Sequence, residues 1–417
     1  MSTRGEHLVR ADRRFATGGG LLARIVAPAI ERVMDDIDRR LLIGGLDATL
    51  PGGSSRRLGF HSKGPRALVR LSSWMALIRL ATSGSVGWYK AWTLGEWSSP
   101  DPVALFELFS ANARPLGDTG RAKGPFRWMN ALSHRLRDNA PRKARENIAA
   151  HYDLGNDFYS AWLDPTMTYS SARFGDPGES LEHAQLHKVH TLLDRLDLKP
   201  GQRLLEIGCG WGTLAIEAAK RGAQVVGLTL STEQKSWAER KTAEAGLGGE
   251  VEIRLQDYRE TDEQFDAVAS VEMVEAVGQR WWGAYLDSIA RNLKPGGRAA
   301  LQFIAIDPAL FDRYARNADF IQTYIFPGGC LLDESEFADL ARARGLSWEG
   351  REGFRLDYAE TLKGWRDRYN DAVARGALSG FAEPFHDLWR YYLMYCEGGF
   401  RGGAIDVAQV TLTKAAA

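Results

Sequence analysis

The chain has 417 residues, of which 44% are hydrophobic and 25% are charged, a composition typical of globular proteins with a sizeable core. Its three cysteines are too few for a disulfide framework, so we expect a reducing, cytoplasmic setting. No run of about 18 apolar residues and no cleavable signal pattern occurs, which argues against a transmembrane helix and a signal peptide.

Charge is distributed unevenly along the chain, although 53 basic and 53 acidic side chains balance overall. Residues 1–145 contain 24 Lys and Arg against 12 Asp and Glu, a net charge of +12, so the remaining residues carry −12. A basic segment of this kind suits an anionic surface, either lipid or nucleic acid. The alternative is chance combined with docking of two complementary domains.

The amino-terminal part predicts a small α+β domain over residues 1–110. Apolar residues recur at helical spacing from Gly20 to Leu42, and Pro28 should start or kink this helix. Residues 46–73 are predicted to form short strands and turns. Four tryptophans follow, and we interpret them as a small core rather than a membrane-interface belt: Trp74, Trp88, Trp92 and Trp97.

A basic segment rich in glycine and proline, residues 111–145, is predicted to be a linker that ends this first domain. From residue 146 to 417 predicted strands and helices alternate, which indicates an α/β fold with a doubly wound, mostly parallel sheet. Residues 307–403 contain more helix than the sheet needs, and we expect them to form a lid or pocket wall. The predicted strands are 203–208, 224–229, 251–255, 265–271, 298–306 and 404–414.

The strongest motif is LLEIGCGWG, residues 204–212, at the end of the first predicted strand of the sheet. Its glycines allow the backbone to approach a nucleotide-like ligand and to turn sharply into a helix. The dinucleotide fingerprint would require glycine where Thr213 stands. The spacing instead resembles motif I of class I methyltransferases, which implies an S-adenosylmethionine site. The implied residues are Glu206, Gly208, Cys209, Gly210 and Gly212.

Two further strand ends support this site. The second strand ends in LTLS, where many methyltransferases carry an acid for the ribose hydroxyls; here Thr229, Leu230 and Gln234 are neutral substitutes. The third strand leads into QDYR. Asp257 could accept a hydrogen bond from the adenine amino group, and Tyr258 could lie against the ring. Taken alone, Asp257 could equally be a surface turn residue.

Seven segments in order resemble the cyclopropane-fatty-acyl-phospholipid synthase family, which includes mycolic-acid cyclopropane synthases and fatty-acid methyltransferases. The resemblance covers about residues 60–414. It implies transfer of a one-carbon unit from S-adenosylmethionine to an alkene of a phospholipid acyl chain, giving a cyclopropane or a methyl or methylene branch. It also places Tyr169 and Ser170 at the cofactor. The segments are AHYDLGNDFYSAWLDPTMTYSSARF (150–174), LLEIGCGWG (204–212), VVGLTLSTEQ (225–234), LQDYR (255–259), SVEMVEAVG (270–278), YIFPGGCL (324–331) and YYLMYCEGGFRGG (391–403).

The resemblance further implies a bound bicarbonate that acts as general base, held in the family by two cysteines, a glutamate, a histidine and a tyrosine. Glu275, Tyr358 and Cys396 match this pattern. Ser171 stands in place of the first cysteine and Gln302 in place of the histidine, and Ala276 replaces a second histidine next to the glutamate. Serine and glutamine can still hydrogen-bond an anion. These departures affect the expectation of ring closure more than that of methyl transfer.

The resemblance assigns the first domain to lipid presentation or to homodimerisation, and it implies a peripheral enzyme on the anionic cytoplasmic face of the inner membrane. No nucleic-acid partner and no metal are expected. The alternative is a small-molecule or nucleic-acid methyltransferase, which should show a polar, open pocket near Glu275. No nucleic-acid module is recognisable before residue 110. A lipid-binding protein with an inactive cofactor fold is a third hypothesis, and the intact glycines argue against it.

Overall fold

The computed structural model describes residues 4–9, 22–117, 154–317 and 319–416, so most of the predicted linker lies outside the described residues. The chain divides into two compact units. The first comprises Met1–Arg137, Ala309–Pro327 and Ser379–Ile405. The second comprises Asp138–Pro308, Gly328–Leu378 and Asp406–Ala417.

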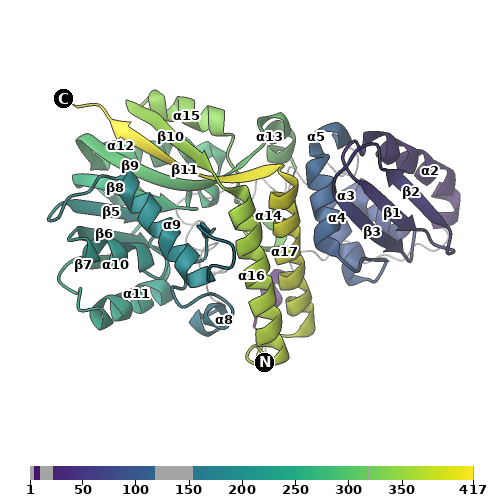
Figure 1. Cartoon of the computed structure of the whole chain (residues 1–417), viewed down its shortest axis with the longest axis horizontal. Helices are drawn as coiled ribbons and strands as arrows, with labels where there is room; N and C mark the ends of the chain where they lie inside the picture. Colours follow the sequence, from purple (N-terminus) through teal and green to yellow (C-terminus); the bar gives the residue numbers. More distant parts are fainter. Residues whose placement is uncertain (1–3, 10–21, 118–153, 318, 417) are drawn as a thin grey trace. The chain divides into compact units, whose positions relative to one another are not determined.

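The first unit contains a four-stranded sheet with the strand order β2-β1-β3-β4 (Figure 1). The predicted amphipathic helix is confirmed, but it begins upstream of Pro28, which therefore does not start it. The tryptophan interpretation holds for Trp88 and Trp97, whose buried rings stack with centroids 4.4 Å apart. The elements are α1 (Glu6–Val9), α2 (Leu22–Arg40), β1 (Gly45–Thr49), β2 (Ser55–Gly59), β3 (Arg66–Leu71), α3 (Met75–Thr93), β4 (Trp97–Ser98), α4 (Pro102–Ala111), α5 (Ala113–Leu116), α13 (Pro308–Ala315), α14 (Phe320–Tyr324) and α17 (Glu383–Gly402).

Part of the predicted insertion belongs to this first unit rather than to the sheet domain. Helix α17 packs closely on α4, because a Cβ at Gly398 would lie only 2.4 Å from the Cβ of Phe106. The hydroxyl of Ser110 donates a hydrogen bond of 2.7 Å to the carbonyl of Gly399. The unit boundaries therefore differ from the predicted division at residues 110 and 146.

The second unit is built on a seven-stranded sheet with the order β10-β11-β9-β8-β5-β6-β7, stacked from top to bottom in Figure 1. The pairs β6–β7, β5–β6, β5–β8 and β8–β9 are parallel, and β10–β11 is antiparallel. The predicted doubly wound sheet is confirmed, whereas β10 was not predicted. The strands are β5 (Arg203–Ile207), β6 (Gln224–Thr229), β7 (Val251–Leu255), β8 (Phe265–Val271), β9 (Leu293–Ile306), β10 (Leu346–Gly353) and β11 (Ile405–Lys414).

The strand order reverses direction at β5, with β6 and β7 on one side and β8 and β9 on the other. In such sheets ligands bind outside the carboxyl ends of the strands at this switch point. Leu192, Leu204 and Leu214 are buried in a core that α9 and α10 share with the sheet. The helices of this unit are α8 (Asn156–Ser160), α9 (Leu181–Arg195), α10 (Thr213–Lys220), α11 (Thr232–Glu244), α12 (Trp282–Asn292), α15 (Glu334–Arg342) and α16 (Arg355–Ala374).

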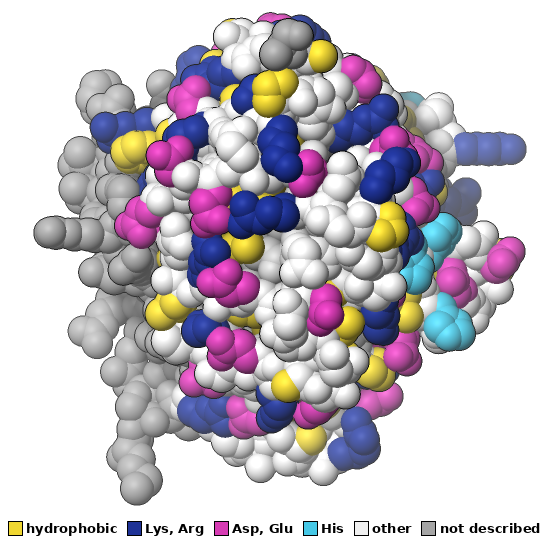
Figure 2. Space-filling model, turned by 90° about the vertical axis from the view of Figure 1, so that its left-hand side faces the viewer, with side chains coloured by type: hydrophobic (Ala, Val, Ile, Leu, Met, Phe, Trp, Pro, Cys, Tyr) yellow, Lys and Arg dark blue, Asp and Glu magenta, His cyan; other side chains and the backbone are white. Residues whose placement is uncertain are grey.

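The side of the second unit seen in Figure 2 carries basic and acidic side chains interspersed, with only scattered hydrophobic ones. Ion pairs of the second unit include Arg342 with Asp339 and Arg344 with Asp287. Within the described part of the chain, no helix combines the length and the apolar character needed to cross a membrane. Nothing in the visible charge pattern of this side of the second unit singles it out as a lipid-facing surface.

Candidate active site

A pocket lies in the second unit at the carboxyl ends of β5, β6 and β8, where the strand order predicts a ligand. The structure brings most of the predicted cofactor residues together around it. Those that line the pocket are Tyr169, Ser170, Glu206, Gly208, Cys209, Gly210, Thr229, Leu230, Gln234 and Tyr258. Gly212 and Asp257 are the two that do not.

The glycines of the motif serve two different purposes. Gly210 has φ of +52°, and a Cβ built there would meet no atom within 4 Å, so its backbone faces open space in the pocket. Gly212, with φ of +93°, starts α10, and its Cβ would come 2.9 Å from the Cβ of Ala238 in α11. Gly210 therefore allows a ligand to approach the backbone, and Gly212 allows two helices to pack.

Glu206 offers a test of whether S-adenosylmethionine fits this pocket. The side chain is 4% exposed, and its Oε2 atom has no hydrogen-bond partner in the described structure. Burial raises the pKa of the Glu206 carboxyl to about 8. A buried carboxylate without a full set of donors is costly. The ammonium or sulfonium group of S-adenosylmethionine would supply the missing positive charge, so these residues fit the cofactor.

The end of β6 presents a neutral polar edge to the pocket. The hydroxyl of Thr229 donates to Oε1 of Gln234 over 2.8 Å. Ser231 caps α11 by accepting a hydrogen bond of 3.3 Å from the backbone N–H of Gln234. The cap fixes the first turn of α11 and with it Gln234, whose contact with the ribose stays a prediction.

Tyr258 lines the pocket, while the neighbouring Asp257 is engaged elsewhere. Both carboxylate oxygens of Asp257 bind the guanidinium of Arg259, at 2.8 and 2.6 Å. Its proposed contact with adenine therefore stays a prediction, and Gln256 lines the pocket in its place.

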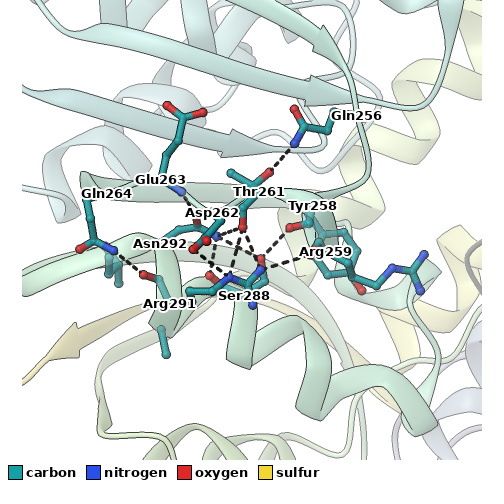
Figure 3. Close-up of polar contacts among 12 residues, drawn as sticks. Gln256, Tyr258, Arg259, Thr261, Asp262, Glu263, Gln264, Ser288, Arg291 and Asn292 are labelled. Carbon is teal, nitrogen blue, oxygen red and sulfur yellow. Dashed lines mark hydrogen bonds and ion pairs between the residues drawn. The ribbon is translucent and has the colours of Figure 1, made fainter.

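Side chains of helix α12 hold the segment after Asp257 through hydrogen bonds to its backbone (Figure 3). The hydroxyl of Ser288 donates to the carbonyl of Tyr258 over 2.8 Å, and the side chains of Arg291 and Asn292 donate to the carbonyl of Thr261. These contacts fix the backbone that carries the Tyr258 ring.

One functional candidate was missed by the sequence analysis: Glu272, the first residue after β8. Its Oε1 accepts hydrogen bonds of 2.8 Å from the backbone N–H of Ser171 and from Nε2 of Gln302. Its Oε2 accepts a hydrogen bond of 2.6 Å from the hydroxyl of Tyr358. Three residues predicted to hold an anion thus converge on a carboxylate of the chain itself, and Glu272 lines the pocket.

The backbone of Glu272 adopts an unusual conformation. Its φ is +46°, in the left-handed region, where a residue other than glycine costs about 1–2 kcal/mol. The N–H of Glu272 donates to the carbonyl of Gln302 over 2.8 Å, which holds this geometry. Such strain persists where the surroundings determine the conformation, and it is frequent at functional sites.

Glu275, the predicted glutamate of the base site, has different surroundings. It lies in a 3-10 turn (Val274–Ala276), and its carboxylate accepts a hydrogen bond from the backbone N–H of Ile304. Burial raises its pKa to about 8, and its Oε2 is buried without a partner in the described structure. Ala276 lines the pocket and Glu275 does not. Its catalytic role stays a prediction, as does that of Cys396, which lies in α17 of the first unit.

A buried lysine, also unpredicted, balances the acids of the pocket. Lys188 of α9 is 1% exposed, and its Nζ donates to the hydroxyl of Ser170 over 2.6 Å. Burial lowers its pKa to about 8, while the charges of Glu272, Asp164 and Glu206 act in the opposite direction. The charge of Lys188 therefore lowers the pKa values of Glu206 and Glu272, against the larger effect of burial.

Tyr169, which lines the pocket, packs against three other aromatic rings. The ring of Tyr169 lies 5.3 Å from that of Trp365, 5.6 Å from Trp162 and 5.5 Å from Tyr159, measured between centroids. Aromatic faces attract cations. Among the residues that the structure describes, no group of histidine, cysteine or acidic side chains could hold a metal ion.

Comparison with known proteins identifies relatives of the whole chain and of the second unit. A family model described as mycolic acid cyclopropane synthetase matches residues 139–410. The tuberculostearic acid methyltransferase UfaA1 of Mycobacterium tuberculosis is 38% identical over 407 residues, covering 94% of this chain and 91% of the relative. The cyclopropane-fatty-acyl-phospholipid synthase of Escherichia coli is 38% identical over 299 residues, covering 68% of this chain and 75% of the relative.

A solved structure agrees with these similarities. The mycolic acid cyclopropane synthase CmaA1, complexed with SAH and CTAB, superposes with a TM-score of 0.61 and 32% sequence identity. The match covers 65% of this chain and 98% of that protein.

Proposed function

The chain belongs to the mycolic acid cyclopropane synthetase family of S-adenosylmethionine-dependent methyltransferases, and we propose the following acceptor for its methyl group. The acceptor is the double bond of an unsaturated fatty acyl chain in a membrane phospholipid. The product is a cyclopropane or a chain with a methyl or methylene branch. The names of two relatives support this acceptor, since one is a tuberculostearic acid methyltransferase and the other a cyclopropane-fatty-acyl-phospholipid synthase.

The observation that carries the proposal is that cofactor residues and a hydrogen-bonded carboxylate share one pocket. Gly210 and Tyr258 line the cofactor part, and Glu272 lines the same pocket. Methylation of an amine or a hydroxyl leaves a proton on nitrogen or oxygen, which water can remove. Methylation of an alkene leaves a carbocation, and a proton must then be taken from carbon by a base placed inside the pocket.

The electron flow accounts for both product classes. Bound S-adenosylmethionine supplies an electrophilic methyl group. The π electrons of the alkene form the new carbon–carbon bond as the sulfur–carbon bond breaks and leaves its electron pair on sulfur. Loss of a proton from the new methyl group closes the ring, whereas a hydride shift followed by proton loss gives a methylene branch. The rings around Tyr169 suit the cation that precedes either product.

The proposal places the enzyme on the anionic, cytoplasmic face of the inner membrane. The net charge of +12 on residues 1–145 favours such a surface. The first unit would present lipid to the pocket or mediate homodimerisation.

The test uses the full-length protein with S-adenosylmethionine and vesicles of monounsaturated phosphatidylglycerol. Mass spectrometry should show acyl chains that have gained one CH2 unit, and gas chromatography should separate ring from branch. Fully saturated vesicles are the control and should remain unmodified. Methylation of a small amine or of nucleic acid without any change in the lipid would contradict the proposal.

A further inference from the structure

We propose that Glu272 is the general base of this enzyme and that its carboxylate takes the place of a bound bicarbonate. The inference rests on the proposed function, because it concerns the proton that alkene methylation must release. It follows from three observations: the donors of three anion-site residues are already used, the hydrogen-bond direction is fixed, and the local charge disfavours a second anion.

Three of the five residues expected to hold a bicarbonate donate to Glu272 instead, namely Ser171, Gln302 and Tyr358. The N–H of Ser171 and the hydroxyl of Tyr358 each have one hydrogen, and these point at Oε1 and Oε2 over 2.8 and 2.6 Å. The amide of Gln302 has two hydrogens. It donates one to Glu272 over 2.8 Å and the other to the carbonyl of Ser171 over 3.3 Å. The hydroxyl of Ser171 donates to the carbonyl of Ala172 over 2.9 Å, so each donor of these three residues already has an acceptor.

A relay across β11 fixes the direction of these hydrogen bonds. Arg195, which can only donate, gives Nε–H to Oε1 of Gln409 over 3.2 Å. Nε2 of Gln409 then donates to Oε1 of Gln302 over 3.1 Å, so the amide of Gln302 must present Nε2 to Glu272. Oε1 of Glu272 must therefore accept from Gln302, and an ionised carboxylate, which only accepts, suits the end of this chain.

The surrounding charge suits one carboxylate and opposes a second anion. Desolvation raises the pKa of Glu272, while Tyr358, Lys188 and Gln302 counteract this. A carboxylate with a raised pKa is a stronger base once it is ionised, and the three neighbours favour the ionised form against desolvation. Glu206 lies in the same pocket, so a bicarbonate would be the third acid beside a single buried lysine.

The proton transfer balances without any other reactant. The carboxylate of Glu272 takes a proton from the carbon chain, and the electron pair of that C–H bond forms the ring bond or the new double bond. Glu272 becomes a neutral acid, and the methyl donor has already left as a neutral thioether. The proton is returned to solvent before the next turnover.

The first experiment needs no variant: activity of the full-length protein on monounsaturated phosphatidylglycerol vesicles, in buffer purged of carbon dioxide and then with bicarbonate restored. We expect the two rates to agree within about twofold, because the base belongs to the chain. A rate that collapses on purging and recovers with bicarbonate would overturn the inference. A protein inactive in both buffers would instead contradict the proposed function.

The second experiment removes the carboxylate. Glu272→Gln should lower kcat at least about 100-fold, the usual scale for loss of a general base, with the affinity for S-adenosylmethionine nearly unchanged. Glu272→Gly suits the backbone, because φ of +46° is unstrained for glycine, and it vacates the space among the donors. Bicarbonate or formate should therefore restore part of the activity of Glu272→Gly but none of Glu272→Gln.

The matched control is Glu217→Gln, which neutralises a carboxylate of α10 that binds His190 and Lys220 outside the pocket. Its turnover should stay near that of the unchanged protein. Near-normal turnover of Glu272→Gln, in a folded protein that binds S-adenosylmethionine, would remove Glu272 from the mechanism.

Discussion

Two glutamates three residues apart have carboxylates with different surroundings, and this difference predicts how stability depends on pH. The carboxyl of Glu272 receives three hydrogen bonds. That of Glu275 receives one from the Ile304 backbone, and its pKa rises from the ordinary value of 4.5 to about 8. Between these two pH values the folded protein keeps a proton that the unfolded chain releases, so stability falls as pH rises.

Glu275→Gln should remove this loss of stability at high pH, because a glutamine amide is neutral at every pH. Its oxygen can still accept the hydrogen bond from the N–H of Ile304. The free energy of unfolding of the variant should match that of the unchanged protein near pH 4.5. Near pH 8 the free energy of unfolding of the variant should exceed that of the unchanged protein by about 4 kcal/mol. Denaturant unfolding across this pH range gives the measurement, and a variant less stable at pH 8 would contradict the prediction.

Gly210 provides a second prediction for a single residue, because its backbone faces the space predicted for the cofactor. Gly210→Val should weaken binding of S-adenosylmethionine by about 10- to 100-fold, because the new side chain occupies ligand space. Titration calorimetry measures this change. The matched control is Gly246→Val: Gly246 also has a positive φ and an open Cβ position, but it lies outside the pocket. Equal affinity in the two folded variants would contradict the assignment of the motif.

The sequence analysis named ten of the residues that line the pocket, but it did not single out Glu272. The glycine motif and the ends of β5 and β6 follow from local spacing, which a sequence displays directly. The place of Glu272 depends on a left-handed φ and on donors from Ser171, Gln302 and Tyr358, far apart in the chain. The position directly after the predicted strand 265–271 was the only signal available in the sequence.

At the scale of elements, the relay from α9 through β11 to β9 positions the carboxylate of Glu272. Gln409→Leu should break the relay, cost about 1–3 kcal/mol of stability and leave the Gln302 amide without its anchor. A weaker hydrogen bond to the ionised form raises the pKa of Glu272. The acidic limb of the kcat profile should therefore move to higher pH, since the base works only when ionised.

This shift distinguishes positioning from a purely structural effect. Gln264→Leu is the matched control: it removes an amide that donates to the carbonyl of Arg291, away from the pocket (Figure 3). It should leave the pH profile unchanged. If Gln409→Leu lowers stability but keeps the same profile, Gln409 has no influence on the base.

Element prediction succeeded for strands with buried apolar side chains and failed for a strand that is mostly exposed. The predicted strands 224–229, 251–255 and 265–271 coincide with β6, β7 and β8. Strand β10 escaped prediction because most of its side chains are exposed, which leaves no hydrophobic pattern. Helix α17 was predicted within the insertion, but its packing on α4 is a long-range contact that periodicity cannot reveal.

At the scale of the whole molecule, the separation of charge along the chain predicts salt-sensitive membrane binding. The excess of +12 lies in residues 1–145. Attraction to anionic lipid is worth about 1 kcal/mol for each basic residue near the surface, and it is screened over about 8 Å at physiological salt. Flotation should show preference for phosphatidylglycerol over phosphatidylcholine vesicles, with binding that weakens as salt is added.

Charge reversal locates the surface responsible. Replacing Arg121, Lys123 and Arg127 by glutamate should reduce binding at least about tenfold, because three attractive charges become repulsive. The matched control reverses three basic residues of the second unit, Arg221, Arg240 and Lys241, and changes the net charge equally. Since these lie outside the basic segment, we expect a much smaller loss. Equal losses would mean that only total charge matters, and salt-independent binding to both lipids would contradict electrostatic docking altogether.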